Sequence, residues 1–542
     1  MIVDIIQKKA SVEVSYINER GQIDIETIPA KFENWVKCSS TDPNADKVFR
    51  NWTGENVKKI PSYTFLDQNL REFLIKSISP EISKKLFAYN KPNWYAVDIE
   101  IDIRKAKGFP HPENAIYPIA SIQITNTKLS TVILMFDDMN RIEGTDEYRK
   151  FVEERVNAHF KGNKKCEELI AKHTDDGFLP YSHIVFKSES EMMNKYFEYQ
   201  RKAFHSIMGW NWDGFDNPYI HNRSKILGVA QTKASPIFRL DEKTNKPKHR
   251  LEVDLMKVVE KFDFTVEKTS LSLNYIASEV LEIAKVVYEG SFLDLFLDKD
   301  NFIIYSAIDT VILMMIHLQI NTISSLEMVS YYAKIPLEDG FSTLRIGDAL
   351  FFDEQYANNV IFCYEDLYRS KSVSVEVVRY NGLLCKVINT IDNNIIVEVQ
   401  GGGERYKIPK DKAVYVYDEN ILDDFANDTD FIGGYVIDPR YNMGEWIALI
   451  DFKSLYPTCG QSLGCSFENI IKENATIKEQ KEFAKQGHRI SLNGTVYDRD
   501  NTGVIKSIWD RLIYERYHFK DIMLHIENVL IPIIEKYIED EK

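Results

Sequence analysis

The stretch YAVDIEIDI, residues 95–103, alternates acidic and aliphatic side chains in a pattern that decides the fold around it. On a β-strand, side chains two residues apart point to the same face. Asp98, Glu100 and Asp102 would therefore share one face. Carboxylates crowded in this way repel one another unless a cation neutralises them, and their hard oxygens suit Mg²⁺ or Mn²⁺. An acidic strand face that is simply exposed to solvent is the alternative.

Two further strand-like runs follow, IASIQIT at residues 119–125 and TVILMF at residues 131–136. Together with the acidic stretch they predict a β-meander that begins with the acidic strand. Apolar periodicity then predicts helices around residues 188–205, 270–284 and 302–320. These elements together predict an α/β domain.

Composition narrows the class of protein. A formal charge of -15 argues weakly against indiscriminate nucleic-acid binding, although local basic strips can coexist with an acidic total. The six cysteines include no CxxC pair and no zinc spacing, which favours reduced thiols. The sequence opens without a signal-peptide pattern, and the apolar run at 302–320 contains Asp309 and His317. We therefore expect a buried helix there, no membrane partner and a cytoplasmic location.

Two more segments carry carboxylates at positions that suit the acidic strand. In GWNWDGFDNPYI, residues 209–220, Asn211, Phe215 and Asp216 follow a strand-like run and lead into a helix. In YSAIDTVIL, Tyr305 and Asp309 are four residues apart and so project from one helix face. Taken singly, Asp216 could be a simple helix cap and Asp309 a satisfied structural residue.

Together, the three acidic segments resemble the exonuclease segments of the proofreading DNA polymerases. The resemblance implies an RNase H-like fold and a 3′ to 5′ exonuclease with two metal ions, Mg²⁺ or Mn²⁺, which would activate a water and stabilise the leaving oxygen. Tyr305 would orient the attacking water, and Asp213 is not assigned. Metal binding and catalysis are assigned to four carboxylates, Asp98, Glu100, Asp216 and Asp309.

A later stretch, DFKSLYPT at residues 451–458, resembles the first palm segment of the family B DNA polymerases. The family usually has Ser where this sequence has Thr458. The resemblance implies that the catalytic Asp451 holds two further metal ions and that Tyr456 blocks the ribose 2′ hydroxyl. The residues between them would bring backbone amides to the deoxynucleoside triphosphate: Phe452, Lys453, Ser454 and Leu455.

Flanking segments extend this resemblance. FIGG at residues 431–434 resembles the family's Tyr-x-Gly-Gly element near the template strand, which makes Phe431, Gly433 and Gly434 candidates for DNA binding. Residues 491–520 resemble the start of the fingers in polymerases of large tailed phages. Arg516 and Lys520, four residues apart on a helix, would then grip the triphosphate. A solvated basic face is the alternative.

The resemblance extends over the chain as an α/β multidomain fold class with six segments. These are an amino-terminal α+β domain in two parts (1–92 and 323–369), the exonuclease domain (93–322), an inserted β module (370–425), a partial palm (426–500) and a partial fingers helix (501–542). The β module is predicted from alternating runs separated by the turn words NG, DNN and GGG. Pro532 should kink or divide the last helix, and its apolar stripe would pair with a helix of a second chain.

No KxxxNSxYG or YxDTDS segment occurs in the sequence, so Asp451 lacks partner carboxylates. We expect the amino-terminal part of a split or truncated polymerase, completed by a second polypeptide that carries the remaining fingers, palm and thumb. Primer–template DNA, deoxynucleoside triphosphates and a sliding clamp are the other expected partners. The alternatives are a stand-alone exonuclease with a vestigial palm and a non-catalytic nucleic-acid-binding regulator.

Further DNA contacts are predicted beside the acidic segments. Residues 238–255 read as a hairpin, which in related polymerases helps to separate primer from template; a solvated turn fits equally well. Asn211 and Phe215 are the other candidates near the trimming site, and Trp210, Trp212 and Phe215 could stack on bases or belong to the core. The basic tip of the hairpin would consist of Lys243, Lys246, Lys248 and Arg250.

Overall fold

The computed structural model describes residues 1–105, 108–263, 268–284, 290–363, 377–380, 383–391, 394–399, 405–409, 414–416, 455–500 and 503–541. By its contacts the chain divides into two units. The first unit comprises Met1–Glu33 and Pro61–Tyr356, and the second comprises Asn34–Ile60 and Ala357–Lys542.

The first unit opens with a three-stranded antiparallel sheet in the order β1-β2-β3. Its elements are β1 (Ile2–Gln7), β2 (Ser11–Ile17), β3 (Ile23–Pro29), α1 (Asp67–Glu72), the π-helical η1 (Phe73–Ser77) and α2 (Pro80–Leu86). Side chains of the sheet such as Val12 and Val14 pack against Leu74 and Leu86 of these helices. Helix α2 begins at Ser79, whose hydroxyl accepts a hydrogen bond from the Ile82 N–H.

A six-stranded sheet forms the centre of the first unit, in the order β10-β9-β8-β7-β11-β12. Its strands are β7 (Trp94–Ile101), β8 (Ile119–Asn126), β9 (Thr131–Phe136), β10 (Tyr181–Phe186), β11 (Ser206–Gly209) and β12 (Leu251–Asp254). Strands β7, β8 and β9 pair antiparallel, which confirms the predicted meander. Strand β11 runs parallel to both β7 and β12, and β10 runs parallel to β9.

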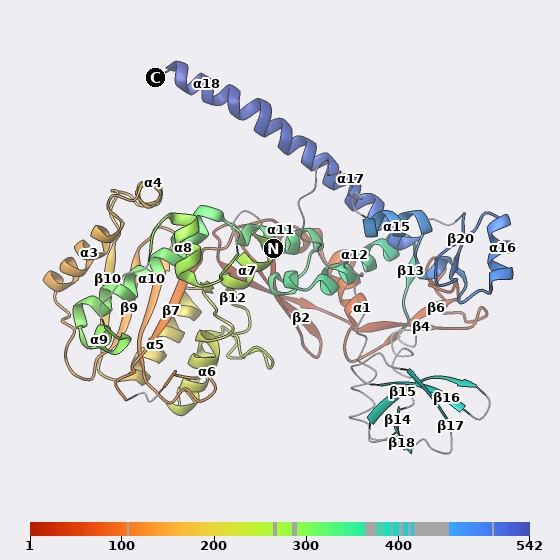
Figure 1. The fold of residues 1–542 in the computed structure, drawn as a ribbon, viewed down its shortest axis with the longest axis horizontal. Helices are drawn as coiled ribbons and strands as arrows, with labels where there is room; N and C mark the ends of the chain where they lie inside the picture. The colour runs from red at the N-terminus through yellow and green to blue at the C-terminus, as the bar shows by residue number, and fades with distance from the viewer. Residues whose placement is uncertain are drawn as a thin grey trace, which may run out of the picture. The chain divides into compact units, whose positions relative to one another are not determined.

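Helices cover both faces of this sheet (Figure 1). Ala96 of β7 belongs to a core shared with α3 (Asp146–Phe160) and α10 (Lys299–Ile320). Val97 and Ile99 belong to the opposite core, shared with α5 (Glu189–Lys202) and α6 (Asp216–Ile226). The two-residue period of a strand therefore places Asp98 and Glu100 on the same side of the sheet as α10.

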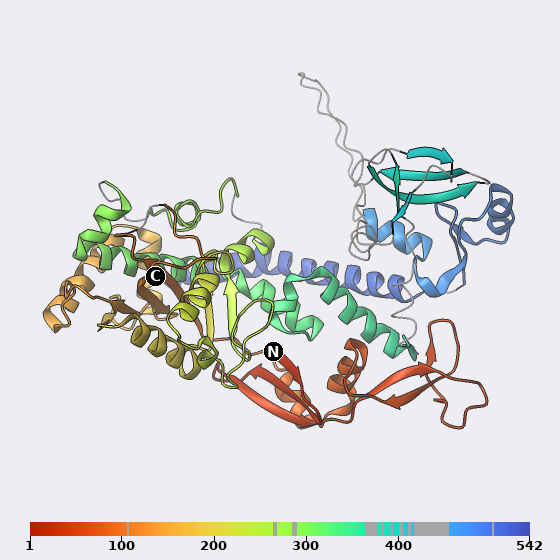
Figure 2. The same ribbon diagram turned by 90° about the horizontal axis from the view of Figure 1, so that it is seen from below.

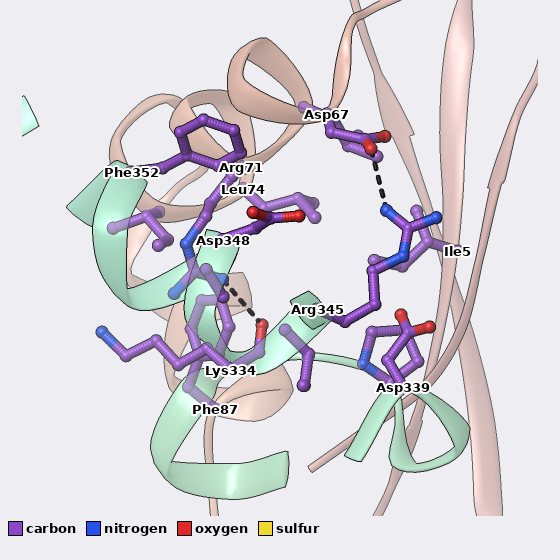
Figure 3. A pocket seen from close by; sticks show the side chains of 15 residues that line it. Ile5, Asp67, Arg71, Leu74, Phe87, Lys334, Asp339, Arg345, Asp348 and Phe352 are labelled. Atoms are coloured by element: carbon purple, nitrogen blue, oxygen red, sulfur yellow. Dashed lines mark hydrogen bonds and ion pairs between the residues drawn. The ribbon is translucent and has the colours of Figure 1, made fainter. Parts of the chain in front are cut away.

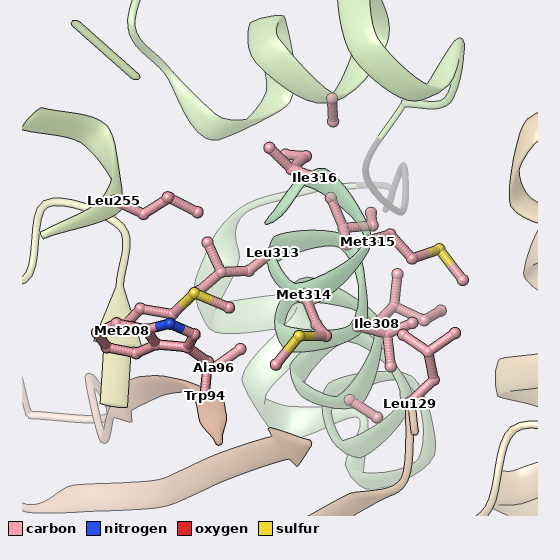
Figure 4. Close-up of a cluster of buried hydrophobic side chains, with 14 of the residues drawn as sticks. Trp94, Ala96, Leu129, Met208, Leu255, Ile308, Leu313, Met314, Met315 and Ile316 are labelled. Carbon is pink, nitrogen blue, oxygen red and sulfur yellow. The ribbon is translucent and has the colours of Figure 1, made fainter. Parts of the chain in front are cut away.

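Helix α10 is apolar around its whole circumference and lies inside the first unit (Figure 4). Its length and composition would allow it to cross a membrane, but 78% of its most apolar window is buried within the structure. Met314 and Leu313 pack towards Trp94 and Met208 of the sheet. The predicted buried helix is thus confirmed, and Asp309 lies on a helix whose residues from Phe302 to His317 are almost all buried.

The remaining helices of the first unit surround these layers. They are α4 (Lys164–His173), η2 (Gln231–Ala234), α7 (Leu255–Phe262), α8 (Leu273–Leu281), α9 (Phe292–Leu297), α11 (Ile323–Ala333), η3 (Leu337–Phe341) and α12 (Thr343–Ala357). Glu327 of α11 ties the amino-terminal part of this unit to the central sheet, because its carboxylate accepts hydrogen bonds from Trp94 Nε1 at 3.0 Å and Tyr89 Oη at 3.2 Å.

The second unit contains several small sheets. Strands β4 (Glu33–Lys37) and β6 (Val57–Pro61) pair with each other, as do β5 (Arg50–Asn51) and β13 (Val360–Ile361). A five-stranded antiparallel sheet has the order β17-β16-β15-β14-β18 (Figure 2). Its strands lie within residues 370–425, the range in which the sequence predicts an inserted β module. These strands are β14 (Val377–Tyr380), β15 (Leu383–Ile391), β16 (Asn394–Val399), β17 (Arg405–Pro409) and β18 (Val414–Val416).

The carboxyl-terminal part of the second unit joins short elements to a long helix. The short elements are α15 (Leu455–Leu463), η6 (Phe467–Asn469), β19 (Ile470–Lys472), α16 (Ile477–Lys485), β20 (Arg489–Ile490) and β21 (Val496–Tyr497). The long helix comprises α17 (Val504–His525), the π-helical η7 (Ile526–Leu530) and α18 (Ile531–Glu541). Pro532 does not interrupt this helix, which continues into α18; because proline has no N–H and its ring crowds the preceding turn, the helix widens into a π turn just before it.

Candidate active site

Three carboxylates from two elements meet between the central sheet and α10. One ligand oxygen from each of Asp98, Glu100 and Asp309 lies within 4.8 Å of the others. Asp98 and Glu100 are half-buried on β7, whereas Asp309 on α10 is only 2% exposed. The period of the strand and the packing of the helix on its face bring together acids that are about 200 positions apart in the sequence.

Asp216, the first residue of α6, is held against the same strand. It is 3% exposed, and its carboxylate accepts a hydrogen bond from the backbone N–H of Ile99. This contact is possible because β11 pairs with β7 only as far as Met208 opposite Ala96 and then ends at Gly209. The edge of β7 beyond that point is open to the α6 start. Asp98, Glu100, Asp216 and Asp309 are called the carboxylate cluster below.

The carboxylate cluster is crowded with like charge. Burial, followed by the negative charges of Asp98 and Glu100, raises the pKa of Asp216 well above its usual range. The charged form of the cluster is therefore costly without a counter-ion. A divalent cation would remove this cost, and a donor set made only of carboxylate oxygens fits Mg²⁺ or Mn²⁺.

Tyr305 lies one helical turn before Asp309 on α10, and its hydroxyl donates a hydrogen bond to the Asp309 carboxylate. Burial and then the charges of Asp309 and Glu100 raise the pKa of Tyr305. The phenol therefore stays protonated at neutral pH and remains a hydrogen-bond donor beside the cluster.

Asp102 does not join the cluster, although it shares the alternation of Asp98 and Glu100. The pairing of β7 with β8 shifts register between Glu100 and Ile101, where the strand ends. The Asp102 carboxylate instead accepts a hydrogen bond from Arg104 Nε at 2.9 Å. This bulge separates the two acids that face α10 from the third.

The loop that leads to Asp216 is fixed by a tight turn. Asn211 has φ +58°, and its carbonyl accepts hydrogen bonds from the N–H groups of Gly214 and Phe215, each at 3.0 Å. A Cβ at Gly214 would lie 2.4 Å from the Asn211 Oδ1, so only glycine fits without rearrangement. The Asn211 side chain itself is exposed, and its role in DNA binding stays a prediction.

Trp212 anchors the same loop in the core. Its ring is 1% exposed, and its Nε1 donates a hydrogen bond to Glu252 Oε2 at 3.0 Å. Burial raises the pKa of Glu252 to about 7, although the positive charge of Lys246 opposes the shift. Trp210 packs against the core, and its Nε1 donates to the Leu271 carbonyl at 2.9 Å. Trp212 is therefore a core residue, whereas Trp210 is only partly buried and its stacking on bases stays a prediction.

Two lysines neutralise Asp213, three residues before Asp216. Lys246 Nζ lies 2.9 Å from Asp213 Oδ1 and 3.2 Å from Glu338 Oε1, and Lys257 Nζ lies 2.7 Å from Asp213 Oδ2. Burial alone would raise the pKa of Asp213, but the charges of Lys246 and Lys257 lower it. Asp213, Lys246, Lys257 and Glu338 are called the lysine bridge below. This bridge ties the loop carrying Asp216 to η3.

The lysine bridge corrects the predicted basic hairpin tip. A short hairpin does form, with a bridge between Leu240 and Pro247. Lys248 nevertheless pairs with Asp241 at 2.9 Å, and the Arg250 Nε donates to the Gln200 carbonyl at 3.1 Å. With Lys246 also turned inwards, only Lys243 of the four predicted cations is exposed. Lys246, Lys248 and Arg250 are unavailable to DNA because each is engaged by a carboxylate or a backbone carbonyl, and a local sequence pattern does not reveal these partners.

An aromatic pocket of about 430 Å³ opens beside Glu100. Phe109 and Phe215 line it with ring centroids 5.7 Å apart, and Phe292 also lines it, 6.2 Å from the Tyr305 ring. Phe215 was predicted as a candidate for DNA contact, whereas Phe109 and Phe292 carry no recognisable sequence signal. Their position depends on long-range packing of loops onto the cluster.

The residues predicted for nucleotide addition are only partly described. Asp451, Phe452, Lys453 and Ser454 lie outside the described residues, as do Phe431, Gly433 and Gly434. Leu455 begins α15, and the Tyr456 side chain is 81% exposed. Arg516 and Lys520 are exposed on α17, one turn apart. Their roles stay predictions.

Helices α15 and α17 pack closely. Gln461 Nε2 donates to Asp510 Oδ1 at 2.5 Å. A Cβ at Gly460 would meet the Trp509 ring at 1.7 Å, so glycine is required where the two helices touch.

Comparison with known proteins agrees with both parts of the chain. The family described as "DNA polymerase family B, exonuclease domain" matches residues 64–276, and "DNA polymerase family B" matches residues 384–534. The DNA-directed DNA polymerase of Escherichia phage RB69 is 22% identical over 95% of this chain and 53% of its own length. That of Enterobacteria phage T4 is 24% identical over 94% of this chain and 52% of its own length.

A further relative, "DNA polymerase 1" of Sulfurisphaera ohwakuensis, is 23% identical over 71% of this chain and 36% of its own length. The chain thus spans about half the length of the phage relatives it matches. Two descriptions of one family, found in the expected order and together matching about two thirds of the sequence, agree with the acidic site and the mixed α/β fold. The chain accordingly belongs to the family B DNA polymerases, with an exonuclease domain and a polymerase region.

Proposed function

We propose that this chain trims the 3′ end of DNA by metal-dependent phosphodiester hydrolysis. The observation that carries the proposal is the convergence of Asp98, Glu100 and Asp309 within 4.8 Å, with Asp216 held against the same strand. The sheet order β9-β8-β7-β11-β12, with β8 antiparallel to its neighbours, supports the RNase H-like fold that the resemblance implies.

The carboxylates of the cluster and the neighbouring Tyr305 would have different roles in the hydrolysis. Asp98, Glu100, Asp216 and Asp309 would hold two Mg²⁺ or Mn²⁺ ions. When bound, such ions lower the pKa of a water and stabilise the oxygen that leaves the phosphorus. Tyr305, kept protonated and bonded to Asp309, would orient the attacking water through its hydroxyl.

The aromatic pocket suits the terminal nucleotide. Phe109, Phe215 and Phe292 lie beside Glu100, so a base stacked among them would present the adjacent phosphodiester to the carboxylate cluster. Stacking on aromatic rings is tolerant of sequence, as trimming of any mismatched end requires.

The test is a degradation assay with the purified full chain. A 5′-labelled primer with a mismatched 3′ end, annealed to template with Mg²⁺, should shorten stepwise, and a 3′-labelled primer should release its label in the first step. The double variant Asp98→Asn, Glu100→Gln should leave the primer intact. The matched control is Asp146→Asn on α3, which replaces a carboxylate with 93% side-chain exposure; this variant should trim normally. Equal trimming by the double variant would refute the proposal.

The polymerase region supports a second proposal, nucleotide addition. It rests on the family match to residues 384–534 and on the exposed pair Arg516 and Lys520, which could bind a triphosphate. Because Asp451 lacks its partner carboxylates in this sequence, binding of a deoxynucleoside triphosphate to the chain, and not primer extension, is the test; Arg516→Ala and Lys520→Ala should each weaken that binding. Completion by a second polypeptide, a sliding clamp and a cytoplasmic location stay predictions, as do the alternatives of a vestigial palm and a non-catalytic regulator.

A further inference from the structure

A second pocket of the first unit shares no lining residue with the carboxylate cluster (Figure 3). It opens between β1, α1 and η1 on one side and the segment from Lys334 to α12 on the other. Its volume is about 110 Å³. A cavity of roughly 150 Å³ accepts one benzene molecule, so this smaller pocket has room for one branched aliphatic group or for the inserted edge of a single ring. Its apolar lining includes Leu74, Phe87, Ile335, Ala349 and Phe352.

Two arginines that line this pocket already form ion pairs with carboxylates of the chain. Arg71 donates from Nε and Nη2 to the two carboxylate oxygens of Asp353, both at 2.7 Å, and from Nη2 to the Ala333 carbonyl at 2.8 Å. Arg345 pairs with Asp67, with Nη1 and Oδ2 2.8 Å apart (Figure 3). The Lys334 ammonium lies 5.5 Å from the centre of the Phe87 ring.

Two further carboxylates, Asp339 and Asp348, line the same pocket. Within the described part of the chain, neither side chain accepts a hydrogen bond or forms an ion pair; the electrostatic neighbours of both are Arg345 and Asp67, and Asp339 also has Asp4 and Lys248 nearby. Burial raises the pKa of both, because the positive charge of Arg345 is shared with Asp67 and does not compensate fully. Figure 3 shows the Asp348 carboxylate between the apolar side chains and Arg345. The pocket thus combines an apolar floor with a rim that has more negative than positive charge available.

We propose that this pocket binds a peptide segment of a partner protein that inserts one aromatic or branched aliphatic side chain and places a neighbouring Lys or Arg beside Asp339 and Asp348. The volume fits a single side chain and is too small for a nucleotide or a lipid chain. Anchoring by one buried side chain with a charged rim is a common arrangement in protein interfaces. The proposed peptide site shares no lining residue with the carboxylate cluster, so this proposal does not depend on the proposed exonuclease activity.

The probe for this site is the tripeptide Ac-Lys-Phe-Lys-NH2, titrated into the full chain and followed by ligand-detected NMR. Ac-Lys-Ala-Lys-NH2 and Ac-Glu-Phe-Glu-NH2 should each bind at least about tenfold more weakly, because they lack the anchor or the matching charge. Raising the salt concentration should weaken binding of the cationic peptide.

Variants locate the binding on the pocket. Asp339→Asn with Asp348→Asn should weaken Ac-Lys-Phe-Lys-NH2 about tenfold, and Ala349→Phe should block it by filling the floor. Asp348→Asn alone changes only an exposed side chain, so its folding is secure, and a loss of about threefold is expected. Asp146→Asn removes the same charge elsewhere and should bind as the wild type does.

Three results would overturn the proposal. Equal binding by the wild type and the Asp348→Asn and double Asn variants would place the peptide elsewhere on the acidic surface. Equal binding of the alanine peptide would show that no side chain is inserted. Binding of free phenethylammonium as tight as that of the tripeptide would indicate a small-amine site instead of a peptide site.

Discussion

The carboxylate cluster and the lysine bridge are neighbours in sequence and opposite in electrostatics. Asp216 and Asp213 are three residues apart in one loop, yet the pKa of the first is raised and that of the second is lowered. Asp216 is surrounded by other acids, whereas Asp213 has two ammonium groups within 2.9 Å of its oxygens. Among the described residues, two ammonium groups compensate Asp213 at the bridge, whereas Asp216 at the cluster faces the negative charges of Asp98 and Glu100, an arrangement that suits a site binding cations from solution.

The largest effect should come from Asp216→Asn. Because it removes a metal-binding oxygen, trimming should fall on the order of 10³-fold, about 4 kcal/mol of transition-state stabilisation. The metal-free variant should unfold at the same or a higher temperature, since a repulsive charge is gone. Single-turnover trimming and thermal unfolding in EDTA measure the two quantities. Asp213→Asn is the matched control and should show the reverse: a lower unfolding temperature and a smaller loss of activity. If both variants changed activity and unfolding temperature in the same way, the proposed difference in role between Asp216 and Asp213 would be wrong.

Lys246→Met tests the bridge from its other side. Removing the ammonium leaves Asp213 with Lys257 alone and takes the bridge to Glu338 away, and the loss of this partly exposed network should cost about 1–3 kcal/mol. Urea unfolding followed by circular dichroism measures this loss. Lys243→Met, at an exposed position of the same hairpin, should change the free energy of unfolding by less than about 0.5 kcal/mol. A destabilisation by Lys246→Met no larger than this control would mean that the bridge is not structural.

Glu252, beneath Trp212, should make stability depend on pH. Its pKa is about 7 in the folded protein against the usual 4.5, so the folded state holds the proton more tightly. Its contribution is therefore fully present below pH 4.5 and is lost as the pH rises through 7. The shift corresponds to about 3 kcal/mol. The free energy of unfolding, measured from pH 5 to pH 8, should decrease with rising pH in the wild type. The control Glu154→Gln, at an exposed position, should show the same decrease, and Glu252→Gln should show a smaller one. An unchanged slope in Glu252→Gln would place the titration elsewhere.

Metal should stabilise the cluster without help from substrate. At a free Mg²⁺ concentration a hundred times the dissociation constant, a ligand of the folded state adds about 2.7 kcal/mol to the free energy of unfolding. The double variant Asp98→Asn, Glu100→Gln should lose this gain, whereas Asp213→Asn should keep it. Differential scanning calorimetry with and without Mg²⁺ is the measurement. Equal stabilisation of the wild type and the double variant would show that the ions bind elsewhere.

Local patterns in the sequence were enough to predict the secondary structure around the site. The two-residue period of β7 puts Asp98 and Glu100 on one face, the spacing of four puts Tyr305 above Asp309, and the apolar run predicts the buried α10. The same reasoning could not tell Asp102 from its neighbours, because the register shift that diverts it arises from pairing with β8. Nor could it tell Lys246 from Lys243, because the partner Glu338 lies far along the chain.

The sequence by itself determined the acidic strand, the meander that follows it, the apolar helix and the family to which their order points. Only the tertiary structure decided which acids converge, which lysines turn inwards and which phenylalanines line the pocket beside Glu100. The physical reason is range: backbone periodicity assigns each side chain to a face of its own element, whereas packing of distant elements decides which faces meet and therefore which charges find a partner.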